Sequence, residues 1–230
     1  IAMIEFQSKL YQAIRSAGGG GFGVNLVLTR SFDGTTWGNW LKDGSYPQIY
    51  AYSDVALATF DPTGSDNRLY QAARQSGSNK VLTRNLNENG NWSSWEIDTQ
   101  TGVTGSIAMI PFNGRLYQAT RTYSSVLTRY KTGHDEPWQH DAETAQEVGG
   151  DGWGVSRQSL VYNSNVEMAV LKDRLYQAIR VNTTSSLTTS RIWTRYLDAG
   201  GTSWSEWTID PYSQRALSDV RLLAFDANGD

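Results

Sequence analysis

The chain has 230 residues, of which 39% are hydrophobic and 12% aromatic, and its formal net charge is −3. This length and composition are typical of a folded all-β domain with a sizeable core. The acidic balance gives no support for binding to a phosphate backbone. No apolar run is long enough to span a bilayer, and the absence of cysteine excludes disulfides and thiolate metal sites.

One hairpin pattern recurs along the chain. In chain order it reads IAMIEFQSKLYQAIR from Ile1, VALATFDPTGSDNRLYQAAR from Val55, SIAMIPFNGRLYQATR from Ser106, VEMAVLKDRLYQAIR from Val166 and, truncated, VRLLAFDANGD from Val220. The Leu-Tyr-Gln triplets begin at Leu10, Leu69, Leu116 and Leu175, so their spacings are 59, 47 and 59 residues. Repeats of this length indicate a blade, solenoid or array architecture.

Each repeat predicts four short strands. In residues 55–99 these are VALATF, RLYQAAR, KVLTRNL and NWSSWEI, separated by polar turns rich in Gly, Asn and Asp. No window holds the 3.6-residue apolar spacing of a helix. Repeated four-stranded antiparallel units predict an all-β fold, a β-propeller with four-stranded blades.

We therefore expect a single β-propeller domain over 1–230, with repeats at about 1–54, 55–105, 106–165 and 166–219 and a partial fifth at 220–230. Four blades are favoured, with the strand Val220–Phe225 overlapping Ile1–Phe6 to close the ring. Five blades are the alternative, in which the last blade has an open edge that another chain must fill.

Enzyme and metal chemistry have weak support in the sequence. Both histidines, His134 and His140, lie in one turn region whose spacing matches no zinc pattern. Glycosidases need two carboxylates across the scissile bond, but Glu96, Glu167 and Glu206 occur singly rather than at one repeated position. The arginines are distributed by the repeat, so we expect them not to converge on one centre. The prediction is a non-enzymatic protein with no catalytic residues, metal or cofactor.

Arginine and tryptophan recur at fixed places in the repeat. An arginine can stack on a tryptophan of the next strand as part of the scaffold. The same pairing also suits a sugar, whose apolar face stacks on an aromatic ring while its hydroxyls accept hydrogen bonds. Repeated weak sites of this kind would gain affinity through multivalency.

Three motifs resemble the blades of tachylectin-type propeller lectins: the hairpin VEMAVLKDRLYQAIR, the strand RIWTR, and the Gly-Gly or Asn-Gly turn before Trp in GGTSWSEW and NGNWSSW. SIAMI followed by RLYQ has a looser similarity to fungal propeller lectins that bind fucose. The tachylectin resemblance implies sites for N-acetylated amino sugars between adjacent blades. It implies carbohydrate-binding roles for Asn25, Arg30, Trp40, Asn79, Arg84, Trp95, Ser125, Arg129, Arg195 and Trp207.

The sequence thus predicts a multivalent lectin whose partners are glycans carrying N-acetylglucosamine, N-acetylgalactosamine or related sugars. An extracellular location is favoured, nucleic acid and membrane insertion are not expected, and homo-oligomerisation stays open. The alternative is a protein-binding or structural propeller segment of a larger toxin or adhesin, in which the repeated Arg and Trp side chains are scaffold only.

Overall fold

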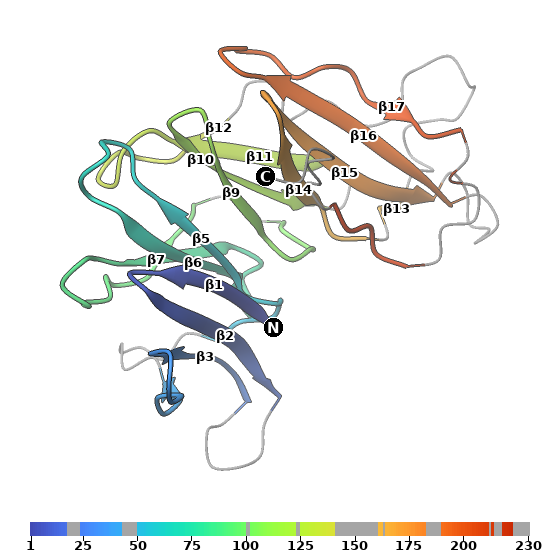
Figure 1. Cartoon of the computed structure of the whole chain (residues 1–230). Coiled ribbons are helices and arrows are strands. Elements are labelled where there is room, and N and C mark those ends of the chain that lie inside the picture. Colours follow the sequence, from blue (N-terminus) through green and yellow to red (C-terminus); the bar gives the residue numbers. More distant parts are fainter. Residues whose placement is uncertain are drawn as a thin grey trace.

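Four antiparallel sheets form the described part of the chain in the computed structural model (Figure 1). The structure describes residues 1–17, 24–42, 50–99, 102–122, 125–140, 161–162, 164–182, 190–211, 213 and 218–222. These residues contain strands and turns but no helix. The all-β class and the four-stranded antiparallel blades predicted from the repeat are therefore confirmed.

Each sheet holds one copy of the repeat, with its strands in chain order. The first sheet contains β1 (Ala2–Phe6), β2 (Lys9–Ala17), β3 (Val24–Phe32) and β4 (Leu41–Lys42). The second contains β5 (Ala56–Phe60), β6 (Arg68–Arg74), β7 (Val81–Leu86) and β8 (Glu96–Ile97). The third contains β9 (Ala108–Phe112), β10 (Arg115–Arg121), β11 (Val126–Lys131) and β12 (Gln139–His140). The fourth contains β14 (Glu167–Leu171), β15 (Arg174–Asn182), β16 (Ser190–Asp198) and β17 (Thr208–Ile209), and β13 (Val161–Tyr162) also pairs with β15.

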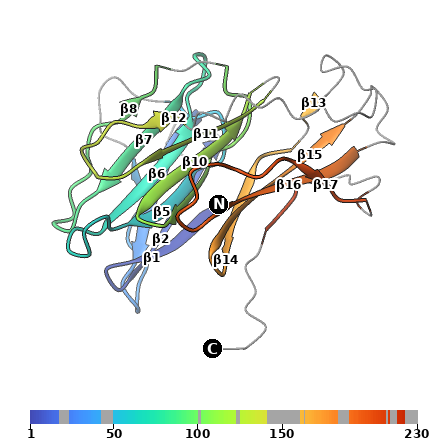
Figure 2. The ribbon, with the colours of Figure 1, turned by 90° about the horizontal axis from the view of Figure 1, so that it is seen from above.

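The sheets follow one another along an arc (Figures 1 and 2). Their first strands lie side by side, β1 against β5, β5 against β9 and β9 against β14, as the inner strands of propeller blades do. The short fourth strands lie on the outside. The first and fourth sheets occupy the two ends of the arc (Figure 1).

Burial follows from this stacking. In the second sheet Leu69, Tyr70 and Gln71 are at most 1% exposed, because a neighbouring sheet covers each face. In the first sheet the matching residues of β2 are only half-buried. Strands covered on both faces need apolar side chains on both, which explains why the sequence does not alternate strictly.

The connections between sheets are hydrogen-bonded to both sheets that they join. The Ala51 amide donates to the Asn25 carbonyl of the first sheet, at 2.7 Å, and the Tyr52 amide donates to the Arg74 carbonyl of the second, at 2.7 Å. The next connection repeats this pattern: the amides of Val103 and Thr104 donate to the carbonyls of Asn79 and Arg121. These hydrogen bonds hold neighbouring sheets together at the end of the molecule where the inner strands begin.

The start of the fifth copy lies beside the fourth sheet. Residues 218–222 form no described strand, but Asn165 Nδ2 donates to Asp219 Oδ2 at 3.3 Å and Arg221 Nη1 lies 2.5 Å from Glu167 Oε1. Val220 is 8% exposed. The segment thus begins where the inner strand of a next blade would begin. The predicted overlap with Ile1–Phe6 depends on residues 223–225, which lie outside the described residues, and stays a prediction.

Candidate functional site

A buried relay of polar side chains connects successive sheets. In the second, third and fourth sheets the glutamine of the second strand donates from Nε2 to a threonine of the preceding sheet. In all four sheets its Oε1 accepts from Nε of the arginine on its own third strand. The threonine contacts are Gln71–Thr29 at 2.9 Å, Gln118–Thr83 at 3.0 Å and Gln177–Thr128 at 2.9 Å. The arginine contacts are Arg30–Gln12 at 2.8 Å, Arg84–Gln71 at 2.7 Å, Arg129–Gln118 at 2.9 Å and Arg195–Gln177 at 2.8 Å.

The same arginines stack on the tryptophans of the fourth-strand region. In three sheets the guanidinium carbon lies 4.3–4.7 Å from the centres of two indole rings: Arg30 with Trp37 and Trp40, Arg84 with Trp92 and Trp95, and Arg195 with Trp204 and Trp207. Such cation–π contacts are strongest where water is excluded. The Leu-Thr-Arg strand and the Trp-x-x-Trp strand therefore form one interlocked unit.

The third sheet replaces the second indole with a carboxylate. Arg129 stacks on Trp138 at 4.5 Å and pairs through Nη1 with Asp98. Burial lowers the pKa of Arg129, and the Asp98 charge opposes this shift. In the sequence, Asp141 stands three residues after Trp138, where the other sheets have their second tryptophan, but it lies outside the described residues.

The ten residues predicted to bind sugar occupy two separate regions. Arg84, Arg129 and Arg195 are 2–6% exposed, so a ligand could reach them only if the blade opened. Trp95 is buried with them, while Arg30, Trp40 and Trp207 are half-buried. Asn25, Asn79 and Ser125 lie instead around the turns before the third strands. The structure does not bring the ten together in a pocket, and their sugar-binding role stays a prediction.

The two asparagines have local bonds of their own. Asn25 and Asn79 have left-handed backbones, with φ of 61° and 53°, a conformation that asparagine tolerates better than most residues. Their Oδ1 atoms accept from Arg15 Nη1 at 3.2 Å and Arg74 Nη1 at 3.3 Å. Ser125 donates its amide to Thr122 Oγ1 at 3.0 Å. These bonds shape the turns at the end of the molecule where the inner strands begin.

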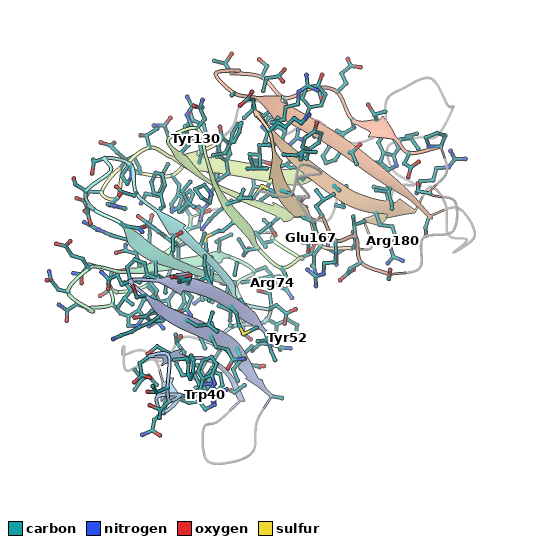
Figure 3. All side chains as sticks on the ribbon, in the orientation of Figure 1. Trp40, Tyr52, Arg74, Tyr130, Glu167 and Arg180 are labelled. Atoms are coloured by element: carbon teal, nitrogen blue, oxygen red, sulfur yellow. The ribbon has the colours of Figure 1, made fainter. Side chains whose placement is uncertain are left out.

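A second set of arginines gathers at that same end. Arg74, Arg121 and Arg180 each lie two residues beyond the alanine that pairs with the first residue of an inner strand. Figure 3 shows Arg74 and Arg180 on the concave side of the arc, with Tyr52 and Glu167, while Tyr130 lies on the convex side. We call Arg74, Arg121 and Arg180 the arginine row.

The row is held by the connections between sheets. Arg74 donates to the carbonyls of Tyr52, at 3.3 Å, and Val103, at 3.4 Å, and its guanidinium carbon lies 4.9 Å from the centre of the Tyr52 ring. Arg121 packs against Gly105, where an added Cβ would lie 2.7 Å from Arg121 Cγ. The Arg180 amide donates to Ser164 Oγ at 2.8 Å. Residues far apart in sequence thus contact the side chains of Arg74 and Arg121 and the backbone of Arg180.

The charges of Arg74 and Arg180 act on Arg121. The pKa of Arg121 is lowered first by burial and then by the charge of Arg74, with a further contribution from Arg180, while Asp219 opposes the shift. The expectation that the arginines do not converge on one centre stays a prediction, although the charges of Arg74 and Arg180 act on Arg121.

A carboxylate lies at the first residue of β14, on the same side of the arc as Arg74 and Arg180 (Figure 3). Glu167 is half-buried, and burial raises its pKa; the charge of Arg221 opposes that effect and Asp219 adds to it. Our sequence reasoning gave Glu167 no role because it is not repeated. The sequence did contain a signal for this residue, because the matching positions of the other inner strands hold alanine: Ala2, Ala56 and Ala108.

The histidines have no metal-binding arrangement in the part of the chain that the structure describes, where no three His, Cys, Asp or Glu side chains form a group. His134 Nδ1 lies 2.8 Å from the Tyr70 hydroxyl and Nε2 lies 2.5 Å from the Asp66 carbonyl. It connects the second and third sheets. Within the described ranges there is also no helix long and apolar enough to cross a membrane.

A cavity of about 340 Å³ opens at the opposite end, between the hairpins of the second and third sheets, lined among others by Phe60, Asp61, Phe112 and Asn113. Its carboxylate, Asp61, accepts the Gly64 amide at 2.7 Å as part of a turn. This lining offers no acid–base pair. The concave end, with Glu167 and the arginine row, is therefore the better candidate site.

The fold and this site define a β-propeller with charged groups at the end where its inner strands begin. No protein-family description and no curated protein matches the sequence. Two similar solved structures are an exo-β-1,3-galactanase from Phanerochaete chrysosporium with β-1,3-galactotriose (TM-score 0.52, 13% identity, 90% of this chain and 51% of that chain) and a thermostable family-43 glycoside hydrolase (TM-score 0.51, 11% identity, 94% and 76%). The chain spans about half the length of the galactanase.

These similarities show a fold shared with β-propeller glycoside hydrolases. They support the predicted propeller but not the tachylectin type in particular. The expectation of a non-enzymatic lectin or a sugar-independent structural segment is contradicted, because the solved structures that share this fold are enzymes that act on carbohydrates.

Proposed function

We propose that this protein is a carbohydrate-processing enzyme that cleaves glycosidic bonds at its concave end, with Glu167 as the general acid. The observation that carries the proposal is the placement of Glu167, a half-buried carboxyl at the first residue of an inner strand. Its raised pKa is what a general acid needs near neutral pH. The fold of the galactanase and of the family-43 hydrolase supports this choice.

Asp219 supplies the second carboxylate. It is exposed, and its charge acts on Glu167, so the two groups lie close together in different environments. A half-buried carboxyl whose pKa is raised and an exposed carboxylate beside it can divide the acid and base roles of glycoside cleavage. Asn165 Nδ2, 3.3 Å from Asp219 Oδ2, orients the exposed carboxylate.

Arg221 fits the same scheme. Its Nη1 lies 2.5 Å from Glu167 Oε1, but the arginine side chain is 68% exposed. An exposed ion pair is screened by water and weak, and burial outweighs it in setting the pKa of Glu167. A substrate that displaces Arg221 would leave the Glu167 carboxyl facing the glycosidic oxygen.

The test is release of reducing sugar from a panel of oligosaccharides and aryl glycosides. Glu167→Gln should lower kcat/KM by roughly 100- to 10,000-fold, the usual contribution of a general acid. Asp219→Asn should also lower it. Glu206→Gln, an exposed glutamate near β17, is the matched control and should keep full activity. Full activity of Glu167→Gln, or no turnover of any glycoside by the unaltered protein, would overturn the proposal.

A further inference from the structure

The buried relay between sheets is incomplete at the first and the fourth sheet. Three glutamines donate to a threonine of the preceding sheet, but Gln12 Nε2 of the first sheet has no hydrogen-bond partner among the described residues. In the fourth sheet Thr194 pairs with Ala178, just as each accepting threonine pairs with an alanine of its own second strand. The Thr194 hydroxyl also has no partner in the described part of the chain. One sheet thus offers a donor and the other an acceptor.

The face of the first sheet that carries Gln12 has the side chains of an interface but is open. Met3 pairs with Gln12 and is 59% exposed. The residues at its position in the other sheets are partly buried and pack against residues of the preceding sheet: Leu57, Met109 and Met168. Leu10 is half-buried, whereas the matching leucines of the other sheets are 0% exposed. We call Met3, Leu10 and Gln12 the head face.

The face of the fourth sheet that carries Thr194 is open as well. Ile192, Thr194 and Tyr196 are alternate residues of β16, so they lie on one face, and all three are half-buried. In the other three sheets the valine and threonine that match Ile192 and Thr194 are at most 4% exposed, because the next sheet covers them. We call Ile192, Thr194 and Tyr196 the tail face.

We propose that two molecules of this protein bind head to tail, with the head face of one packed on the tail face of the other and Gln12 Nε2 donating to Thr194 Oγ1. The two faces are complementary, because they are the two halves of an interface that the chain already forms three times between its own sheets. Within one molecule the first and fourth sheets occupy the two ends of the arc (Figures 1 and 2). A head-to-tail contact leads to a closed ring or to an open chain of molecules.

The contact is compatible with the segment 218–222 and with the proposed function. Arg221 contacts Glu167 at the inner edge of the fourth sheet, but its side chain is 68% exposed, so this ion pair is weak and an arriving sheet can displace it. The alanines that match Glu167 in the other sheets stay half-buried although another sheet follows theirs. Glu167 would therefore keep part of its exposure, and the inference does not depend on catalysis.

The experiment measures the mass of the protein by sedimentation velocity between about 1 and 100 µM. The mass should rise with concentration. Met3→Arg blocks the head face and Thr194→Arg blocks the tail face, and each should weaken association at least about 10-fold, because the contact would bury an unpaired charge. Thr194→Val keeps the shape of the side chain but loses the acceptor, and should weaken association about 3- to 10-fold. Glu136→Arg, in an exposed turn of the third sheet, is the control and should associate normally.

Mixing the two blocked variants gives the sharpest result. Met3→Arg retains an intact tail face and Thr194→Arg an intact head face, so the mixture should form a 1:1 pair although neither variant associates alone. An interface between two head faces or two tail faces would not recover in this way. A monomer at about 100 µM, no recovery in the mixture, or an equal loss in Glu136→Arg overturns the inference. Full association of Thr194→Val overturns the hydrogen bond to Gln12 and decides the matter if Thr194→Arg fails to fold, which melting temperatures show. Absence of glycoside cleavage refutes the proposed enzyme and leaves this inference intact.

Discussion

Replacing Gln118 tests whether the buried relay holds the sheets together. Gln118→Met keeps a similar side-chain volume but loses the acceptor for Arg129 Nε at 2.9 Å and the donor to Thr83 Oγ1 at 3.0 Å. The first bond involves a charged donor and is worth about 2 kcal/mol, and the second, between neutral groups, about 1 kcal/mol. We therefore expect a loss of about 3 kcal/mol in the free energy of unfolding.

The matched control is Gln12→Met in the first sheet. Gln12 accepts from Arg30 Nε at 2.8 Å, but it is half-buried and its sheet stands at one end of the arc. Water can replace part of that bond, so the loss should be about 1 kcal/mol. Urea unfolding followed by tryptophan fluorescence measures both values. Equal losses at the two positions, or less than about 1 kcal/mol at Gln118, would refute the relay as a connection between sheets.

Three further predictions follow from local contacts. The pKa of Asp33 is lowered mainly by hydrogen bonds from the amide of Thr36 and the hydroxyl and amide of Thr35. Its stabilising effect should be complete above the unfolded pKa and be lost gradually as the pH falls toward the folded one, so Asp33→Ala should destabilise most at pH 7 and by a smaller amount at about pH 2.5; equal effects at both would contradict this. Gly105→Ala should cost about 1–3 kcal/mol, because the new Cβ meets Arg121 Cγ, whereas Gly133→Ala, which meets only the exposed Glu136, should cost little by thermal melting. Because the pKa of Glu167 is raised, glycoside cleavage should decline as the pH rises through it, and a rate independent of pH up to 9 would exclude Glu167 as the acid.

The repeat allowed the architecture to be predicted because it is a local pattern. Leu69, Tyr70 and Gln71 read as one strand, and their burial on both faces follows from stacking identical units. The stacking of Arg84 on Trp92 and Trp95 could also be anticipated, since both partners recur at fixed spacing. What the repeat did not reveal was that its polar residues are bonded between sheets, as Gln118 is to Thr83.

The candidate site was missed because it depends on a residue that departs from the repeat and on residues of different repeats that act on one another in the folded chain. Arg74, Arg121 and Arg180 are far apart in sequence, yet the charges of Arg74 and Arg180 act on Arg121 in the folded chain. Glu167 is chemically informative because alanine stands at the matching positions. A search for carboxylates that recur in every repeat excludes such a residue. A search for one polar residue at an inner-strand position that is alanine in the other repeats would have found it.

The direction of the buried relay has a consequence for how the protein is made. Gln71, Gln118 and Gln177 each bond backward, to a threonine of the sheet synthesised before their own, at separations of 35–49 residues. A sheet that has left the ribosome already displays the hydroxyl to which its successor will attach. Assembly can therefore advance in step with translation, one blade at a time, and no blade has to wait for the end of the chain before it finds its neighbour.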